Sequence, residues 1–599
     1  MPTSWAFGTD LGVTMTDEHA LTDTSTFLDA MRRSASVAGD ERGIRFYSDE
    51  QNSERLGYAE LDERARARAV DLVRRGYGPG DVAVLAFDPG FGFIESVYAA
   101  LYAGMAIAPV PVAVGRNPRA VIDRLESIVA DSGSRLVLTE PSALTLLEQA
   151  SLPGVEVSLL SDPDPADAET WTVPAITADS VALLQYTSGS TGAPKGVIVT
   201  QGNLVANEQA IGSVVGDNAD SVWVGWLPHY HDMGLIGLLF RPIFAGSDSV
   251  LTSPSRFLRR PLFWLRLITR HRGTFTVAPD FAYRLCAQVV TDEQLAELDL
   301  SSLRQVVTGA EPVKIGTVRD FADRFAAAGL DPTVFIPAYG MAETTLIISA
   351  AVGREVRAIT ADLGALEKGD LLPAADGRTV DLVMCGPSVP GAVVAIVAPD
   401  TGERLPDGRI GEIWVSGPSV TQGYWGRPEE TAESFGQRLE GEPGAFLRTG
   451  DLGAIVDGEV VVAGRLKDLI ISNGRNIFPQ DVEAVASTVV TTDPGCLAAA
   501  FELAGQPSEV AVVVEIEPRT LATADADVLV ADIRRALASE FALASTGIVL
   551  VRKGMLPRTT SGKIQRRRAR QELLEGALAV AHIDGIVVSE PAPTADAAR

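Results

Sequence analysis

The sequence predicts an α/β protein in which mainly parallel sheets are covered by helices. Short apolar runs typical of buried strands alternate with amphipathic helical segments through the first half of the chain. The clearest stretch passes from a strand at 81–86 to a helix at 91–103, a strand at 106–112 and a helix at 118–132. Because 599 residues exceed what one core normally holds, we expect a large domain with a smaller one attached.

The remaining elements extend the same alternation. The pattern predicts, in chain order, helix 26–39, strand 44–47, helix 62–75, strand 135–139 and strands 180–184 and 197–200. Four later strands each end in polar or glycine-rich residues, at 221–227, 274–277, 303–307 and 334–336. Because ligands collect at the carboxyl ends of strands in such sheets, we expect these four signals to build one site.

The segment 185–196, QYTSGSTGAPKG, lies between two predicted strands and is typical of a phosphate-binding loop. Hydroxyl side chains, glycines that let the backbone approach a ligand, and one lysine can form an anion-binding concavity. The candidate phosphate-binding residues are Thr187, Ser188, Gly189, Ser190, Thr191 and Lys195. The spacing is not that of a Walker loop, because Pro194 separates Gly192 from the lysine. An ordinary surface turn is the alternative, since the same residue types dominate loops.

Composition excludes several classes of function. The content of 46% hydrophobic and 22% charged residues is that of a globular protein, and the net charge of -27 argues against nucleic-acid or anionic-membrane binding. The first twenty residues lack the pattern of a signal peptide, and we expect no membrane span. Cys286, Cys385 and Cys496 have no paired spacing, which favours a cytoplasmic protein without disulfides or zinc.

Several different short motifs lie at the predicted strand ends and further along the chain. They are Gly309-Ala-Glu-Pro312, Tyr339-Gly-Met-Ala-Glu-Thr344, Arg448-Thr-Gly-Asp451, Gly464-Arg-Leu-Lys-Asp468 and Pro557-Arg-Thr-Thr-Ser-Gly-Lys563. An aromatic beside a glycine can stack on a purine, and a carboxylate near phosphates can hold Mg²⁺. Together with the 185–196 segment, and in this order, the motifs resemble those of the adenylate-forming superfamily of acyl-CoA synthetases, peptide-synthetase adenylation domains and luciferases.

The resemblance implies a role for each matching residue in binding and activating ATP. Adenine contacts are expected from Gly309, Ala310, Glu311 and Tyr339, other nucleotide contacts from Gly340 and Met341, and ribose contacts from Asp451 and Arg465. Glu343 and Thr187 are expected to hold Mg²⁺, Thr344 to contact the α-phosphate, and Lys467 to act as a hinge. The expected catalytic residues are Lys563, His231, Thr187 and Thr344, and the expected acyl pocket consists of His231, Met233, Leu235 and Leu238.

Taken alone, the motifs also fit ordinary structural roles. Tyr339 suits a core aromatic, Glu343 a solvated helix charge, and Lys563 a solvated lysine in a basic stretch. That stretch is consistent with either a docking site for an acidic carrier protein or a solvated helix face, and it contains Arg566, Arg567, Arg568 and Arg570. His229 and His231 suggest a metal only weakly, because no third ligand lies nearby in the sequence.

Two features resemble fatty acyl-AMP ligases within this superfamily. Asp232 follows His231 in LPHYHDMGLIG, where acyl-CoA synthetases usually carry glycine. A charged segment at about 352–385 has the weak periodicity of a long loop and resembles the insertion thought to restrain the small domain of these ligases. The implied fold is a large N-terminal domain at 25–465 with a small β subdomain, and a small mobile α+β lid domain at 466–585. An extension at 1–24 and a tail at 586–599 flank them.

The implied reaction uses ATP and Mg²⁺ to convert a fatty acid to acyl-adenylate with release of pyrophosphate. The acyl group then passes to the phosphopantetheine of a partner, which is a separate holo acyl carrier protein or a carrier domain of a polyketide or peptide synthase. No carrier serine motif follows Arg570, so we expect that partner to be another chain. The alternatives are a long- or medium-chain fatty acyl-CoA ligase and a non-catalytic nucleotide-binding protein.

Overall fold

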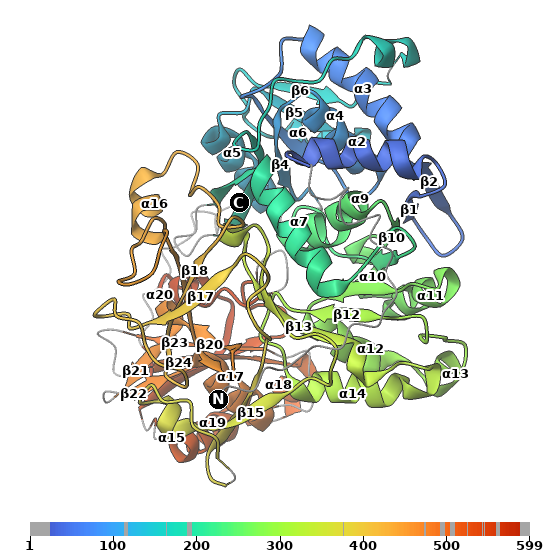
Figure 1. The fold of residues 1–599 in the computed structure, drawn as a ribbon. Helices are drawn as coiled ribbons and strands as arrows, with labels where there is room; N and C mark the ends of the chain where they lie inside the picture. Colours follow the sequence, from blue (N-terminus) through green and yellow to red (C-terminus); the bar gives the residue numbers. More distant parts are fainter. Residues whose placement is uncertain are drawn as a thin grey trace, which may run out of the picture.

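The computed structural model describes most of the chain. The described residues are 24–112, 118–162, 164–188, 194–374, 376–472, 475–490, 497–503, 510–523, 525–541, 543, 545–558 and 563–586. Two large sheets with their helices form the upper and right-hand parts of the molecule in Figure 1, and the residues from about 470 onward lie at the lower left. Residues of both parts line one cleft. Nearly all of the predicted extension at 1–24 and tail at 586–599 therefore lies outside the described residues.

The first large sheet has six strands in the order β6-β5-β3-β4-β7-β8. All neighbours are parallel except β7 and β8, which form an antiparallel hairpin. Its strands are β3 (Val82–Ala86), β4 (Ala106–Val110), β5 (Leu136–Thr139), β6 (Glu156–Leu159), β7 (Val181–Ser188) and β8 (Pro194–Thr200). Its helices are α3 (Tyr58–Arg74), α4 (Phe91–Tyr102), α5 (Pro118–Ser132), α6 (Pro141–Leu147) and the short η1 (Pro165–Thr170).

The second large sheet has eight strands in the order β14-β13-β12-β11-β9-β10-β1-β2, and only its two outer pairs are antiparallel. Its strands are β1 (Gly43–Tyr47), β2 (Ser53–Gly57), β9 (Val222–Gly225), β10 (Asp248–Thr252), β11 (Phe275–Ala278), β12 (Gln305–Thr308), β13 (Phe335–Gly340) and β14 (Ile347–Ala350). Its helices include α2 (Phe27–Ala38), α7 (Gln201–Val215), α8 (Asp232–Gly234), η2 (Leu235–Phe240), α9 (Arg241–Ala245), α10 (Pro254–Arg259), α11 (Pro261–His271), α12 (Asp280–Val289), α13 (Asp292–Leu295), α14 (Ile315–Phe325) and η5 (Ala342–Thr344). These two sheets confirm the predicted α/β class.

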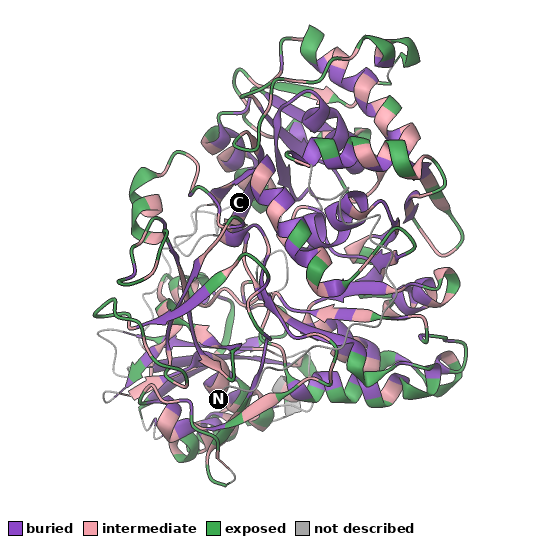
Figure 2. Cartoon of the chain, in the orientation of Figure 1, coloured by how far each residue is buried: buried purple, intermediate pink, exposed green. Residues whose placement is uncertain are grey.

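One apolar core fills the space between the two large sheets. Ala83 and Leu85 of β3 point into it, whereas Val82 and Val84 point into a separate cluster under α5, as the alternation of side chains along a strand requires. The same core takes in residues of β9 and β11 from the other sheet. Figure 2 shows the resulting pattern, with buried strands inside and exposed residues on the outer helices. No helix among the described residues is long and apolar enough to cross a membrane.

The rest of the chain forms smaller sheets beside the cleft. An antiparallel sheet contains β17 (Val393–Val397), β18 (Gly411–Ser416), β19 (Leu447–Val456) and β20 (Glu459–Arg465), with α16 (Pro428–Ser434) before β19 and η6 (Leu466–Asp468) after β20. A four-stranded sheet contains β23 (Ala498–Glu502), β24 (Val510–Ile516), β25 (Thr546–Arg552) and β26 (Val580–Asp584). Around it lie β21 (Ile470–Ser472), β22 (Arg475–Ile477), α17 (Pro479–Val490), α18 (Pro518–Thr523), α19 (Ala526–Phe541) and α20 (Arg566–Leu574).

The segment predicted as a loop-like insertion at 352–385 is folded. β15 (Ala358–Asp362) and β16 (Thr379–Val383) pair as an antiparallel hairpin, and α15 (Leu363–Leu366) lies between them. The strands were not predicted, because each has only five residues and mixes apolar residues with polar ones. The prediction of a long loop is therefore wrong for this segment.

Candidate active site

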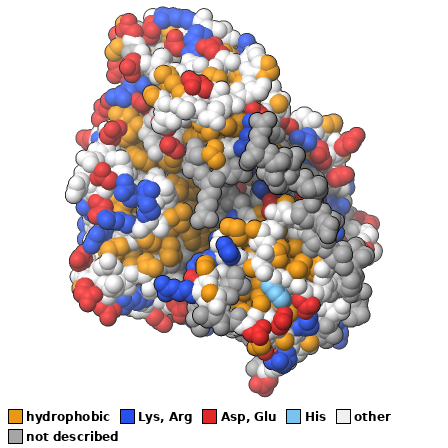
Figure 3. All heavy atoms as spheres, turned by 180° about the vertical axis from the view of Figure 1, so that it is seen from behind, with side chains coloured by type: hydrophobic (Ala, Val, Ile, Leu, Met, Phe, Trp, Pro, Cys, Tyr) orange, Lys and Arg blue, Asp and Glu red, His pale blue; other side chains and the backbone are white. Residues whose placement is uncertain are grey.

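The carboxyl ends of the strands in the eight-stranded sheet border a cleft of about 2460 Å³. Residues that follow β9, β11, β12 and β13 line it, and so do residues of β19, β20 and the C-terminal segment. The four strand-end signals of the sequence therefore meet in one cleft, as predicted. The rear face of the molecule is hollowed, and hydrophobic side chains gather around the hollow (Figure 3).

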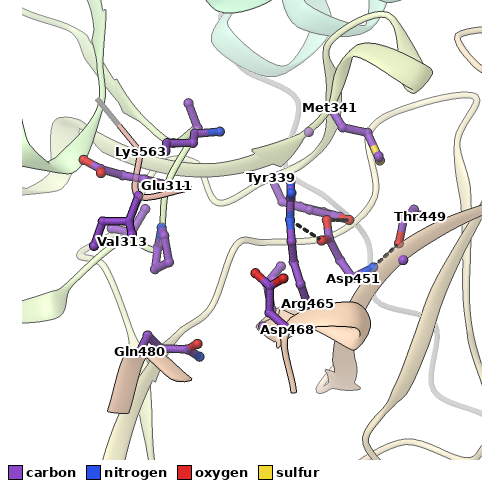
Figure 4. Close-up of a pocket in the computed structure, with 18 of the residues that line it drawn as sticks. Glu311, Val313, Tyr339, Met341, Thr449, Asp451, Arg465, Asp468, Gln480 and Lys563 are labelled. Carbon is purple, nitrogen blue, oxygen red and sulfur yellow. Dashed lines mark hydrogen bonds and ion pairs between the residues drawn. The ribbon is translucent and has the colours of Figure 1, made fainter. Parts of the chain in front are cut away.

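One polar cluster in the cleft joins β13 to β19 and β20. The Tyr339 hydroxyl donates to Asp451 Oδ2 at 2.8 Å, and Arg465 Nε lies 3.4 Å from the other oxygen of the same carboxylate. Thr449 Oγ1 accepts the Asp451 backbone N–H at 3.0 Å, so the turn before the carboxylate is also fixed (Figure 4). Burial raises the pKa of Asp451, while Arg465 and Tyr339 act in the opposite direction. An aromatic ring and a carboxylate held side by side suit a base and its ribose.

Lys563 approaches this cluster from the C-terminal segment. In Figure 4 it lies beside Glu311, across the cavity from Asp451 and Arg465. Burial, followed by the charge of Arg465, lowers the pKa of the Lys563 ammonium, and the carboxylates of Asp232, Glu311 and Asp451 partly offset this. Acidic groups of the large domain therefore surround this cation. Its position suits a site that stabilises negative charge as it develops during a reaction.

The loop that carries Lys563 is anchored on both sides. Gln565 N–H donates to the Pro557 carbonyl at 2.9 Å, and Arg566 pairs with Glu483 at 2.6 Å and with Asp468 at 3.1 Å. Arg566 is therefore held by two ion pairs at the cleft and is not a solvated residue of the helix face, and its part in docking a carrier protein stays a prediction. Of its basic neighbours, Arg568 is exposed but pairs with Glu572 on its own helix, at 2.7 Å.

A second chain of contacts ties the phosphate-loop hairpin to Glu343. Lys195 on β8 lies 5.2 Å from the ring centroid of Tyr424 and 3.6 Å from Glu430. The Tyr424 hydroxyl donates to Glu343 Oε1 at 2.9 Å, and burial raises the pKa of Glu343. The described residues contain no cluster of three His, Cys, Asp or Glu side chains that could hold a metal by themselves. A single carboxylate facing a phosphate site nevertheless fits Mg²⁺, which takes most of its ligands from phosphates and water.

The histidines after β9 have different environments. His231 lines the cleft, and its Nδ1 lies 2.5 Å from Asp232 Oδ1. Burial acts to raise the pKa of Asp232. This pKa nevertheless lies below its ordinary value, because His231 and Lys563 are close. Asp232 is the first residue of α8, and His231 is its N-cap. His229 is buried against Phe93, and burial lowers its pKa to about 4, which suits a neutral core residue.

The turn after β12 carries backbone strain. Ala310 adopts φ 64°, a left-handed conformation that side chains other than glycine rarely take. Its neighbours Gly309 and Glu311 also line the cleft, and Glu311 Oε1 accepts the Phe281 N–H at 2.7 Å. Thr345, just past the motif that contains Glu343, has φ 67°. Strained residues of this kind cluster at functional sites, where the surrounding structure holds them.

Comparison with known proteins agrees with this geometry. The profile of the AMP-binding enzyme family matches residues 31–425. JamA of Moorena producens, a medium-chain-fatty-acid–[acyl-carrier-protein] ligase, is 39% identical over 556 residues, which cover 89% of this chain and 93% of JamA. FadD28 of Mycobacterium tuberculosis, a long-chain-fatty-acid–AMP ligase, is 35% identical over 533 residues, 85% of this chain and 90% of that protein. The chain is an AMP-binding enzyme of the fatty acyl-AMP ligase branch.

A solved structure supports the assignment of this AMP-binding enzyme. It comes from a study of fatty acyl-adenylate ligases from E. coli and L. pneumophila, and it superimposes with a TM-score of 0.81 at 32% identity. The match covers 92% of this chain and 98% of the other. The shared fold therefore extends well beyond the residues that the family profile matches.

Most of the residues predicted from the motifs line the cleft, but some do not. Those that line it are Thr187, Lys195, His231, Met233, Gly309, Ala310, Glu311, Tyr339, Gly340, Met341, Glu343, Asp451, Arg465, Lys467 and Lys563. Thr344 is buried, and its hydroxyl donates to the Met341 carbonyl at 3.0 Å. Leu235 and Leu238 are fully buried and are not among the described residues of the lining. Gly189, Ser190, Thr191 and the side chain of Ser188 lie outside the described residues.

One group of apolar residues in the cleft lining was not predicted. These residues come from α7, β9, η2, β11 and the start of β14 with the residue before it, and they are Ile211, Val215, Trp223, Gly237, Val277, Leu346 and Ile347. The sequence alone does not distinguish these residues from core residues, because a buried strand or helix is as apolar on a face that borders a cavity as on a face that packs in the core. Only the place of Gly237 at the end of the LPHYHDMGLIG motif could have suggested its position.

The insertion and the C-terminal segment share one apolar core. Leu363 and Leu366 of α15 belong to the same cluster as Ile470, Ile477 and Val482. A buried ion pair reinforces this contact. Glu367, only 7% exposed, accepts from Arg378 at 2.9 Å and lies 3.3 Å from Arg475 of β22. The folded insertion is therefore fastened to the segment that carries Lys563.

Proposed function

We propose that this chain activates a fatty acid with ATP to form an acyl-adenylate and then transfers the acyl group to a carrier-bound pantetheine thiol. One observation carries the proposal: Lys563 from the C-terminal segment lies in the cleft beside Glu311 of the large domain, opposite Asp451. That arrangement is the one needed when a carboxylate and a triphosphate, both anions, must be brought together.

In the first step a carboxylate oxygen of the fatty acid attacks the α-phosphorus of ATP. The bond from that phosphorus to the β-phosphate bridging oxygen breaks, and pyrophosphate leaves with the electron pair. Tyr339 and Asp451 hold the adenosine, while Lys563 and Lys195 neutralise charge on the carboxylate and the phosphates. His231, fixed by Asp232, lies where it can orient the acyl carboxylate.

Magnesium is part of the proposal. Glu343 would hold the ion together with phosphate oxygens, and Thr187 on β7 also lines this part of the cleft. Tyr424 donates to one of the two Glu343 carboxylate oxygens. When bound, the ion would supply charge neutralisation on the departing pyrophosphate. We place the reaction in the cytoplasm, where ATP and holo carrier proteins are found.

In the second step the pantetheine thiolate attacks the acyl carbonyl, and AMP leaves as a thioester forms. We propose that the C-terminal segment first turns about Lys467, which lies in η6 between β20 and β21. The name of JamA, an acyl-carrier-protein ligase, supports a carrier protein as acceptor. The ion pair of Glu367 with Arg475 supports a restrained turn that disfavours CoA.

The test is fatty-acid-dependent exchange of labelled pyrophosphate into ATP, followed by offering CoA and a holo carrier protein in parallel. We expect exchange with fatty acids and faster thioester formation on the carrier. Faster acyl-CoA formation would instead support the CoA ligase alternative. Absence of exchange with any fatty acid would leave the non-catalytic nucleotide-binding alternative.

Glu367→Gln tests the restraint. The substitution keeps the side-chain size but weakens the ion pair with Arg475, so acyl-CoA formation should rise several-fold while pyrophosphate exchange changes little. This substitution is a more specific test than deletion of residues 353–380, because the deletion would remove part of the core that the insertion shares with the C-terminal segment. Glu440→Gln, at an exposed position, is the matched control. An unchanged preference for the carrier in Glu367→Gln would contradict the restraint.

A further inference from the structure

Tyr424 lines the cleft and contacts two groups that we propose to act on the triphosphate. Its hydroxyl donates to Glu343 Oε1 at 2.9 Å, and the Lys195 ammonium lies 5.2 Å from the centroid of its ring. The second distance is within the range at which an aromatic ring attracts a cation. One side chain therefore contacts both the carboxylate proposed for Mg²⁺ and the lysine of the β7–β8 hairpin.

The segment that carries this tyrosine pairs with β8 through backbone hydrogen bonds. The Ile198 N–H donates to the Gly423 carbonyl at 3.0 Å, and the Trp425 N–H donates to the Gly196 carbonyl at 2.8 Å. Lys195 directly precedes Gly196 on the same strand. Because these backbone bonds lie on both sides of the tyrosine, they keep its ring beside the lysine.

The tyrosine is also held by α16 and by the residue that follows this helix. Its N–H donates to Thr431 Oγ1 at 2.9 Å, and its ring meets Phe435 edge to face, with centroids 5.4 Å apart and an interplanar angle of 84°. Gly423, at φ 127°, permits this approach, because a Cβ there would lie 2.3 Å from Thr431 Cγ2. None of these contacts uses the tyrosine hydroxyl, so they should survive its removal.

The same segment fixes the backbone of Glu343. The Thr421 N–H, three residues before Tyr424, donates to the Glu343 carbonyl at 3.0 Å. Glu343 is therefore tied to one segment both by its main chain and by its carboxylate. Carboxylates that bind metals are normally oriented by hydrogen bonds of this kind, and loss of such a partner typically lowers metal affinity by about 10- to 100-fold.

We infer that Tyr424 is a positioning residue, which orients Glu343 for Mg²⁺ through its hydroxyl and holds Lys195 for the phosphates through its ring. The two effects are separable, because the hydroxyl and the ring contact different partners. The hydroxyl should matter only when the metal is present, whereas the ring should matter for the nucleotide itself. This inference rests on the proposed function, which assigns Glu343 to Mg²⁺ and Lys195 to ATP.

The experiment measures equilibrium binding of ATP by calorimetry without fatty acid, once with excess Mg²⁺ and once with EDTA. Tyr424→Phe keeps the ring and removes the hydroxyl, so the affinity for ATP with Mg²⁺ should fall about tenfold and the affinity with EDTA should not change. Tyr424→Leu also removes the ring, so the affinity with EDTA should fall about threefold as well. In pyrophosphate exchange, the KM for MgATP of Tyr424→Phe should rise by the same factor as its binding affinity falls.

Tyr77→Phe is the matched control. The Tyr77 hydroxyl donates to Glu156 Oε2 at 2.8 Å, which is the same kind of bond, and neither residue is among the described residues that line the cleft. Both ATP affinities of this variant should equal those of the wild type. A metal-dependent loss in Tyr77→Phe as large as that in Tyr424→Phe would overturn the inference.

A double-mutant cycle tests whether the hydroxyl acts through Glu343. Glu343→Ala should by itself lower the affinity for ATP with Mg²⁺, and the addition of Tyr424→Phe should lower it no further. A further loss of about tenfold in the double variant would show that the hydroxyl acts on another group, and would overturn the inference.

An unchanged affinity for ATP with Mg²⁺ in Tyr424→Phe would also overturn the inference, and so would an equal fall with Mg²⁺ and with EDTA. If Tyr424→Leu fails to fold, Tyr424→Phe decides alone, because it keeps the packing of the ring on Phe435. The binding measurement separates this inference from the proposed function. A metal-dependent loss in Tyr424→Phe, with no pyrophosphate exchange in the wild type, would uphold the role of Tyr424 and reject adenylation.

Discussion

The two ends of the cleft are built in different ways. At the nucleotide end, polar side chains from distant motifs meet across strand ends, as Tyr339, Asp451 and Lys563 do. At the end that we propose for the acyl chain, apolar side chains of continuous helices and strands form the lining, and Trp223 lies among them. In the proposed function, the first end carries the chemistry and the second selects the acid. Changes at the nucleotide end should affect all acids equally, whereas changes at the acyl end should affect acids by length.

The largest effect is expected from Lys563→Ala. Removing the cation that faces the developing charge should lower pyrophosphate exchange by more than about 100-fold, and by the same factor for each fatty acid. Lys553→Ala is the control, because Lys553 lies in the turn after β25 of the same C-terminal segment, pairs with Glu517 and is not among the described residues that line the cleft. A loss that depends on acid length would break the distinction between the two ends.

Asp451→Asn should have a smaller effect. The amide oxygen can still accept the Tyr339 hydroxyl, but the charge and one acceptor for the ribose are lost. The KM for ATP should rise about tenfold, the usual range for a hydrogen bond to a charged group, with the same ratio for short and long acids. Asp457→Asn, in the exposed turn between β19 and β20, should leave the KM unchanged. An unaltered KM in Asp451→Asn would remove Asp451 from the nucleotide end.

The pH dependence of adenylation sharpens the same comparison. Burial lowers the pKa of Lys563, so this lysine loses its proton at a lower pH than an exposed lysine does. Because the protonated form is the active one, kcat/KM should fall on the alkaline side as pH rises through that lowered pKa. Lys563→Arg should lose this alkaline limb, since a guanidinium stays charged. An unchanged limb in Lys563→Arg would assign the titration to another group.

The smallest effect is expected from Glu208→Gln, beside the acyl end. Glu208 lies on α7 one turn from Ile211, and burial raises its pKa to about 8. The pKa of Glu208 is therefore higher in the folded chain than in the unfolded chain, where it is near 4.5. The contribution of Glu208 to the free energy of unfolding is complete below pH 4.5 and is lost as pH rises toward 8. The variant should therefore melt about 2 °C above the wild type at alkaline pH, with a smaller difference in mild acid. An equal difference across this range would show that Glu208 is ionised throughout.

The sequence predicted the nucleotide end better than the acyl end for physical reasons. Motifs at strand ends need particular chemistry, so Tyr339, Glu343 and Asp451 could be found without coordinates, and all line one cleft. The acyl wall needs only apolar side chains of the right size. The resemblance implied Leu235 and Leu238 there, but both are fully buried and neither is among the described residues of the lining, whereas Trp223 was not predicted.

The fold shows the same contrast between local and distant information. Helix α5 matches its predicted limits, because Pro118 and the spacing of apolar residues define it locally. The predicted loop at 185–196 is shorter in the structure, since hairpin pairing extends β7 to Ser188 and starts β8 at Pro194. The hairpin of the insertion likewise depends on partners far away, including the core it shares with Ile470.

The most direct test is a crystal structure with a non-hydrolysable dodecanoyl-adenylate analogue. The adenosine should contact Tyr339 and Asp451, with Lys563 at the phosphate, and the acyl chain should lie against the apolar lining residues of α7 and β11. An adenosine away from Tyr339, or an acyl chain outside this part of the cleft, would contradict the account.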